Sequence, residues 1–153
     1  MSYVRSVLQP GERIKVIGKL HWIVFVRAFV LLAIAIALFG IARRIESQVH
    51  ELVFYAGCLV LLLCALSFLH AWFIRWITEL AITDHRVIYK RGFLSRHTVE
   101  MNMDKVETVD VDQSILGRIL GYGTIRVRGT GQSIENLSRI ASPIALRNAI
   151  TAR

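Results

Sequence analysis

Residues 22–41 read WIVFVRAFVLLAIAIALFGI, a run of twenty residues in which Arg27 is the only charged side chain. A helix rises about 1.5 Å per residue, so this run would span about 30 Å, the thickness of the hydrocarbon core of a bilayer. Residues 52–74 form a second apolar run that contains no Asp, Glu, Lys or Arg. No small-residue cleavage site follows the first run, which argues against a signal peptide. The two runs therefore predict two transmembrane helices.

The basic residues around these runs predict their orientation. Four Lys or Arg precede residue 22, two lie within residues 42–51, and twelve follow residue 74. Positive charge accumulates in the cytoplasmic segments next to membrane helices. We therefore expect a multi-pass protein of the inner (plasma) membrane, with an external loop at residues 42–51 and with cytoplasmic N- and C-termini. Arg27 would then extend its side chain back to the cytoplasmic interface, rather than serve as a functional charge within the membrane.

After residue 76 the pattern changes to short stretches of alternating apolar and polar residues, separated by turn residues. Such alternation is typical of antiparallel strands with one buried face. The pair Ser142-Pro143 marks a helix start, because Ser is a favoured N-cap and Pro is favoured at the first helical position. The segment predicts an antiparallel meander or small barrel closed by a C-terminal helix, with strands at residues 78–83, 86–91, 97–103, 106–112, 124–129 and 135–140.

Residues 12–17, ERIKVI, show the same alternation before the first apolar run, with Ile14 and Val16 on one face. This segment is expected on the same side of the membrane as the β-rich domain. We predict that it adds an edge strand to that domain and so holds the domain close to the bilayer. No Gly-, Ser- or Pro-rich linker follows the second apolar run, which favours the same interpretation.

The chain carries several short motifs in a recognisable order. They are Pro10-Gly11-Glu12, His21-Trp22, LAITDHRVI at residues 80–88, Gly92, LGRILGYG at residues 116–123, and Pro143. Together these motifs resemble the bacterial pleckstrin-homology (PH) domain family of small membrane proteins, formerly a domain of unknown function. The resemblance implies a membrane α-helical hairpin plus a mainly-β PH-like domain, in which two packed antiparallel sheets are capped by a C-terminal helix. It implies no settled biochemical activity.

The expected organisation has five parts. They are a cytoplasmic N-terminal segment with the candidate added strand (1–21), a first transmembrane helix (22–41), an external loop (42–51), a second transmembrane helix (52–74) and a cytoplasmic PH-like domain (76–153). Eukaryotic PH domains that bind phosphoinositides carry a basic cluster on a long loop between their first two strands. We take that connection to be Asp84-His85 here, so the resemblance does not bring phosphoinositide specificity to this chain.

No group of residues predicts catalysis. The five histidines are scattered, and none has a metal-ligand spacing to another His, Cys or carboxylate in a suitable structural context, since the i, i+4 pair Glu46 and His50 falls in the expected short external loop. The sequence contains no nucleophile motif or phosphate-binding Gly-rich loop, and Gly117, Gly121 and Gly123 are interpreted as turn positions that need a positive φ or close packing. Asp110 and Asp112 share a strand face and are interpreted as a solvated acidic edge. We therefore expect no enzyme activity, no catalytic residue, no cofactor and no metal site.

The formal net charge of +8 raises the question of an anionic partner. The basic strands lack the exposed aromatic residues that accompany nucleic-acid binding, so no nucleic-acid partner is expected. The favoured hypothesis is a non-enzymatic, membrane-anchored PH-like interaction or scaffold module that binds another membrane or cytoplasmic protein, with a homo-oligomer also open. The alternative is a membrane protein that binds anionic lipids without headgroup specificity. The candidate lipid contacts are Lys15, Lys19, Arg75, Lys90, Arg91 and Arg96, with Arg126 and Arg128 as further basic residues on a strand.

Overall fold

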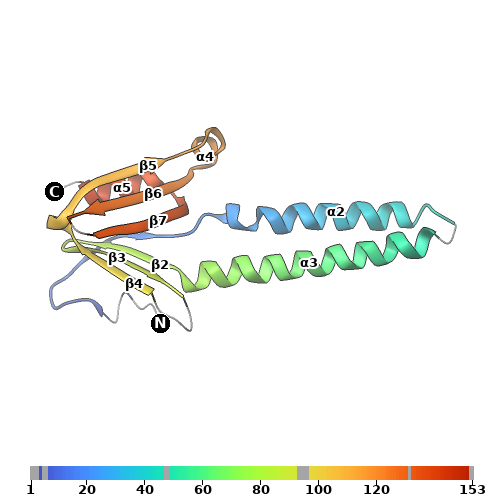
Figure 1. The fold of residues 1–153 in the computed structure, drawn as a ribbon, viewed down its shortest axis with the longest axis horizontal. Coiled ribbons are helices and arrows are strands. Elements are labelled where there is room, and N and C mark those ends of the chain that lie inside the picture. The colour runs from blue at the N-terminus through green and yellow to red at the C-terminus, as the bar shows by residue number, and fades with distance from the viewer. Residues whose placement is uncertain (1–3, 5–6, 47–48, 93–96, 131, 152–153) are drawn as a thin grey trace. The chain divides into compact units, whose positions relative to one another are not determined.

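The computed structural model describes residues 4, 7–46, 49–92, 97–130 and 132–151 (Figure 1). The chain divides into two compact units. One unit comprises residues 22–73, and the other comprises residues 1–21 together with residues 74–153. The second unit is therefore built from two stretches of chain that are separated in sequence by the first.

Two long helices make up most of the first unit. The elements in chain order are η1, a 3-10 turn (Trp22–Phe25), α2 (Val26–Ala42) and α3 (Val49–Ile77), whose last turn belongs to the second unit. By length and composition, both helices are able to cross a membrane. The first predicted apolar run covers η1 and nearly all of α2, and the second lies within α3; no proline interrupts these elements.

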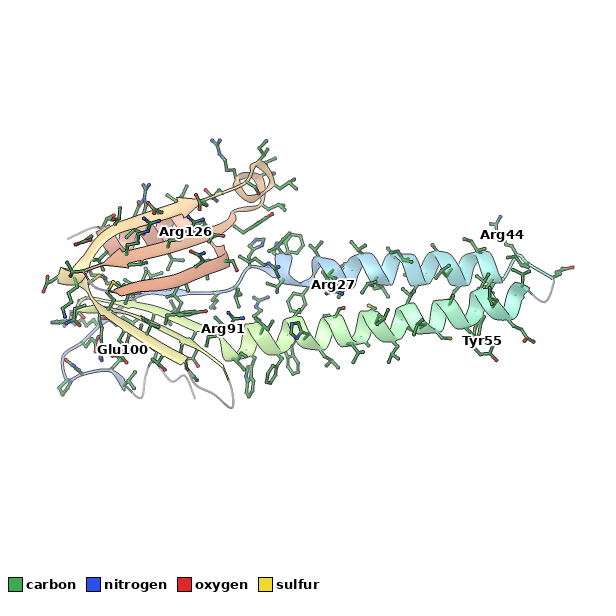
Figure 2. All side chains as sticks on the ribbon, in the orientation of Figure 1. Arg27, Arg44, Tyr55, Arg91, Glu100 and Arg126 are labelled. Carbon is green, nitrogen blue, oxygen red and sulfur yellow. The ribbon has the colours of Figure 1, made fainter. Side chains whose placement is uncertain are left out.

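Small residues line the buried side of both helices at intervals of seven residues. They are Ala28, Ala35 and Ala42 on α2, and Gly57, Cys64 and Ala71 on α3. A seven-residue repeat is the spacing that keeps one seam of a helix facing a neighbouring helix. The Cys64 thiol donates a hydrogen bond to the Ala28 carbonyl oxygen at 3.2 Å. The small side chains thus allow α2 and α3 to pack closely, while many of the larger apolar side chains of both helices are exposed (Figure 2).

The second unit contains two antiparallel sheets and a C-terminal helix, as the family resemblance implied. The first sheet has the order β1-β2-β3-β4 and the second has the order β5-β6-β7. Their strands are β1 (Ile14–Gly18), β2 (Glu79–Thr83), β3 (Arg86–Arg91), β4 (His97–Asn102), β5 (Val106–Asp112), β6 (Tyr122–Gly129) and β7 (Gln132–Ala141). The remaining elements are η2 (Met103–Lys105), α4 (Ile115–Leu120) and α5 (Pro143–Thr151).

The stretch with strand-like alternation before the first apolar run forms β1, which pairs with β2. Residues 19–78 connect these two strands and contain both long helices. Asp84-His85 therefore joins β2 to β3, and our assignment of this turn to the first two strands was wrong. The local pattern predicted a strand near residue 14, but it carried no information about which distant strand would pair with it.

The core lies between the two sheets and is closed by α5. It contains residues from the first sheet (Leu80, Ile82, Val87, Tyr89, Met101), the second sheet (Ile125, Val127, Leu137, Ile140) and the helix (Leu146, Ile150). The opposite face of the first sheet is also covered, because Ala81 and Ile88 are fully buried. Val4 is buried as well, and its N–H donates to the Glu79 carboxylate at 3.3 Å. The N-terminal segment is thus part of the packed domain.

The helix pair provides a matched test of close packing. A Cβ atom at Gly57 would lie 2.9 Å from Cε1 of Phe39, whereas a Cβ atom at Gly40 would have no atom within 4 Å. We expect Gly57→Leu to lower the free energy of unfolding by about 1–3 kcal/mol through overpacking. Gly40→Leu should leave it unchanged or raise it by up to about 1 kcal/mol, because Leu favours the helix over Gly. Thermal unfolding of the full chain in detergent, followed by circular dichroism, measures both effects, and equal stability of the two variants would contradict the packing.

Candidate functional site

The strand register defines two ends of the sheet-containing unit. We call one end the junction end, because the chain leaves it at His21 and returns to it through the last turn of α3; it comprises residues 18–21, 74–80, 89–92, 113–123 and 139–144. We call the other the remote end; it comprises residues 12–14, 83–86, 102–106 and 129–130.

Hydrogen bonds tie the chain to the second sheet just before it leaves the junction end. The His21 N–H donates to the Arg139 carbonyl oxygen at 2.7 Å, and the Ala141 N–H donates to the Lys19 carbonyl oxygen at 2.9 Å. The His21 ring also stacks on the Tyr122 ring, with centroids 5.4 Å apart. The segment after β1 is therefore fixed to both sheets at the point where the first long helix begins.

The structure brings most of the candidate lipid contacts to the junction end. Lys19 follows Gly18, which lies opposite Leu80, and Lys90 lies opposite Glu79. Arg91 is the last residue of β3 (Figure 2). Arg75 lies in the last turn of α3. These four cations thus come from three elements that meet at one end.

Two of the predicted contacts are not in this group, and two cations join it. Lys15 lies between Ile14 and Val16, which pair with Thr83 and Ile82 toward the remote end. Arg96 lies outside the described residues. The additional cations are Arg118 on α4 and Arg139 on β7. Arg118 falls within the LGRILGYG motif, which the sequence interpretation treated only as a series of turn positions.

The basic residues of β6 face acidic residues of β5. The Arg126 guanidinium lies 2.6 Å from the Asp112 carboxylate, and Arg128 lies 3.7 Å from Asp110. All four side chains are exposed by 40–59%, so each pair contributes little to stability. The predicted acidic edge is thus an exposed surface on which each carboxylate has a cationic partner, and Arg126 and Arg128 are partly neutralised before they could meet an anionic ligand.

A buried ion pair lies at the remote end and joins two of the sequence motifs. Both oxygens of the Glu12 carboxylate accept hydrogen bonds from Arg86, at 3.0 Å from Nε and 2.9 Å from Nη2. The Thr83 hydroxyl donates to the same carboxylate at 2.7 Å, and the Gln9 N–H donates to it at 2.8 Å. The Glu12 side chain is only 2% exposed. We call Glu12, Thr83 and Arg86 the clamp, because they attach the N-terminal segment to β2 and β3.

Charge on the clamp is strongly favoured in the folded chain. The hydrogen bonds from Arg86 are the main cause that lowers the pKa of Glu12 from 4.5 to about 2, and they also raise the pKa of Arg86. Arg86 further contacts the Glu100 carboxylate at 2.6 Å and the Val7 carbonyl oxygen at 2.7 Å. Every polar atom that the clamp presents thus has a partner within the chain, which indicates a structural role and leaves no site for a ligand.

The LGRILGYG motif forms α4 and the turn into β6, so the sequence interpretation missed a helix here. It was right about the glycines. Gly121 has a φ of +76° and ends the helix in the left-handed conformation. A Cβ atom at Gly117 would lie 2.7 Å from the Tyr122 carbonyl oxygen, and one at Gly123 would lie 2.8 Å from the Asp112 carbonyl oxygen. A helix of six residues, one of them glycine, gives too little periodicity to be recognised from sequence.

A cavity of about 250 Å³ lies between α4 and the start of α5. Arg118 is the only charged residue in its lining, which consists of Gln113, Arg118, Gly121 and residues 142–145. Within the described part of the chain, no group of three or more His, Cys, Asp or Glu residues is arranged to hold a metal ion.

Residues 16–153 match the family model of the bacterial PH domain. The chain belongs to the bacterial PH domain family. The match starts within β1 and extends beyond α5, so it includes both long helices of this bacterial PH domain as well as its two sheets. PH domains are generally non-catalytic modules that bind lipids or proteins. Comparisons with curated proteins and with solved structures gave no match.

The clamp of this bacterial PH domain predicts a specific loss of stability in acid. Because the pKa of Glu12 is lower in the folded chain, its contribution is fully present above about pH 5 and is lost as the pH falls toward 2. Glu12→Gln should lower the free energy of unfolding by about 2 kcal/mol at neutral pH, and it should reduce the dependence of stability on pH between 5 and 2.

Thermal unfolding of the full chain in nonionic detergent, over this pH range, measures both effects. The matched control is Glu107→Gln on β5, an exposed position at which we expect a change within about 0.5 kcal/mol. A Glu12→Gln variant with the stability and acid sensitivity of the unchanged chain would show that the clamp does not hold the N-terminal segment.

Proposed function

We propose that this bacterial PH domain is a non-enzymatic interaction module that α2 and α3 anchor in the inner membrane. The exposure of the helix pair carries the proposal. Large apolar side chains are exposed on both helices, among them Phe29 (53%), Ile36 (63%) and Leu62 (57%). Soluble proteins rarely present an apolar surface of this extent to water. A bilayer would cover it and would leave the intrahelical hydrogen bonds of the backbone intact.

Aromatic and basic residues support cytoplasmic termini and a short external loop. Trp22 lies at the start of the first helical segment, and Trp72 and Trp76 lie near the end of α3; all three are exposed. Tryptophan is enriched at membrane interfaces, and Lys and Arg are enriched on the cytoplasmic side. Both sheets would then lie at the inner face of the membrane, because they are formed by the segments before and after the helix pair, which carry more Lys and Arg than the loop between the helices.

We favour a protein, rather than a single lipid headgroup, as the partner that this domain recognises. In eukaryotic PH domains a loop between the first two strands holds the phosphoinositide, but in this chain the β1–β2 connection contains the helix pair. The cavity beside α4 has one cation rather than a basic cluster. This cavity thus lacks the cluster of cations that would hold one headgroup, whereas the exposed surface of β5 and β6 and the strand edges offer surfaces for a protein. A crosslinking pull-down from native membranes would identify that partner.

Anionic lipids are the second candidate, and the grouped cations at the junction end favour it. A basic residue within about 8 Å of the inner leaflet, the Debye length at physiological ionic strength, gains roughly 1 kcal/mol from anionic headgroups. Lys19, Arg75, Lys90 and Arg91 are the residues proposed for this contact. Their attraction would orient the domain without selecting a lipid species, because point charges on separate elements do not enclose a headgroup.

The proposed topology predicts opposite locations for two reporters. A reporter fused to the C-terminus should be cytoplasmic. A reporter inserted near Gln48, a residue outside the described part of the chain, should be external. Alkaline phosphatase and fluorescent-protein fusions distinguish the two compartments. Phosphatase activity at the C-terminus, or its absence near Gln48, would rule out the hairpin.

The lipid contact predicts a weak and non-selective preference. When the full chain is reconstituted with spin-labelled lipids, anionic lipids should associate more strongly than zwitterionic ones. The preference should fall as salt is added, and it should be equal for different anionic headgroups of the same charge. The variant Lys19→Gln/Lys90→Gln/Arg91→Gln should lose most of this preference.

The matched control for this experiment changes three cations toward the remote end, Arg13→Gln/Lys15→Gln/Lys105→Gln. This variant has the same net charge as the first, and we expect it to keep the preference for anionic lipids. A strong, salt-resistant preference for a single headgroup would contradict the proposal and would indicate a specific lipid site.

A further inference from the structure

The helix α4 presents its large apolar side chains to solvent. Ile115 is 80% exposed, Leu116 63% and Ile119 75%, while Leu120 is 38% exposed. The one buried residue of the helix is Gly117. A helix on the surface of a soluble domain normally turns its apolar side inward. In α4 the position that faces the domain is glycine, and the positions that face away are Ile and Leu.

This orientation is fixed by hydrogen bonds at both ends of the helix. The Ser114 hydroxyl accepts from the Gly117 N–H at 3.1 Å, and the N–H of Gly121 bonds back to the Gly117 carbonyl oxygen. The Gln113 side chain donates to the Tyr122 carbonyl oxygen at 3.0 Å. A helix of six residues is not stable in isolation. The caps and the close approach at Gly117 therefore hold the apolar side chains outward against the tendency to bury them.

The helix lies at the junction end, next to the point where the chain leaves the sheets. The Tyr122 ring, directly after the C-cap of α4, stacks on the ring of His21. The Ser142 N–H donates to the Gly121 carbonyl oxygen at 2.9 Å. Residue 22, the next along the chain from His21, begins the first apolar segment. The apolar surface of α4 is thus one ring contact away from the start of a segment that the proposed function places in the bilayer.

We propose that α4 inserts its four apolar side chains into the interface of the bilayer that α2 and α3 span; the inference rests on the proposed membrane anchoring. Its composition fits this location, because interfacial helices combine large aliphatic residues with basic ones. Arg118 is its only charged residue, and its long side chain can reach the headgroups while its stem stays with the apolar residues. Lys19 and Arg139, at the same end, add charge complementary to an anionic leaflet.

Insertion of α4 gives the domain a third attachment to the membrane. Two covalent connections alone, at His21 and at the end of α3, leave rotation about the line between them free. A third contact, made by the apolar side chains of α4, restricts that rotation. The remote end and the exposed surface of β5 and β6 then keep a constant direction relative to the membrane, which gives an interaction module a defined surface to present to its partner.

Fluorescent labels at three positions of the full chain test the inference. In a background of Cys58→Ala and Cys64→Ala, single substitutions Ile119→Cys, Asp104→Cys and Leu62→Cys are labelled with an environment-sensitive fluorophore. The protein is then placed in nanodiscs of phosphatidylcholine and phosphatidylglycerol. We expect the label at 119 to show blue-shifted emission, quenching by lipids with nitroxides near the headgroup, and several-fold weaker quenching by aqueous iodide than the label at 104.

The control positions separate the possible failures. Asp104 is exposed at the remote end and should stay accessible to iodide, whereas Leu62 is exposed in the middle of α3 and should be quenched by lipid. If the label at 119 is as accessible to iodide as that at 104 while the label at 62 is quenched by lipid, insertion of α4 is refuted and the anchoring stands. If the label at 62 is not quenched by lipid, the anchoring fails, and the inference fails with it.

Shielding by protein gives a different result from insertion into lipid. A label at 119 that is protected from iodide but not quenched by any nitroxide lipid would show that a second copy or another protein covers α4, which overturns the proposal. A label at Ile115→Cys repeats the measurement at an independent position, where the side chain is 80% exposed and its replacement therefore removes no core packing. Agreement between positions 115 and 119 is required for the inference to hold.

Discussion

The antiparallel pairing of β1 with β2 is the constraint on which the rest of the structure depends. Gly18 lies opposite Leu80, although residues 19–78 separate the two strands. Closing a flexible loop of this length would oppose the pairing through lost chain entropy. The helix pair reduces this loss because it is a hairpin whose open end is packed together, with the rings of Phe25 and Phe68 only 5.2 Å apart. The hairpin brings the chain back near its starting point, so that β1 and β2 can pair at a smaller cost in chain entropy.

The strand β1 also needs contacts at its own ends, because it supplies little of the core. Val16 is only partly buried against the core, and Ile17 is half exposed on the other face. At the remote end the clamp attaches the strand through Glu12 and Arg86. At the junction end Gly18 lies close to Leu80. A Cβ atom added at Gly18 would lie only 2.5 Å from the Leu80 side chain, so a larger residue at position 18 would separate the strands. The sequence motifs that contain Glu12 and Arg86 thus serve to attach β1 to the first sheet.

Local patterns in the sequence predicted most elements but not the pairing of β1 or the clamp. Alternation identified the strands, hydropathy the long helices, and Ser142-Pro143 the start of α5, because each of these signals depends on neighbouring residues. The clamp joins residues more than seventy positions apart, and a local pattern does not encode such a pair. For the same reason Lys15 was grouped with Lys19, although their places along β1 put them toward opposite ends of the sheet. Helix α4 was missed because six residues give too little periodicity to be recognised.

The distribution of the basic residues limits what the net charge of +8 can do. Within the described residues, Arg86 faces Glu12 and Glu100, and the β6 residues Arg126 and Arg128 face acidic residues of β5. The carboxylates of the same chain thus neutralise Arg86 and partly neutralise Arg126 and Arg128. The cations grouped at the junction end come from separate elements, and charges placed in this way attract any anionic surface within about 8 Å. Such attraction orients a domain but does not distinguish one anionic lipid from another. Under the proposed function, specific recognition would depend on the shape of the surfaces away from the junction end, and a fixed orientation of the domain would then matter for that recognition.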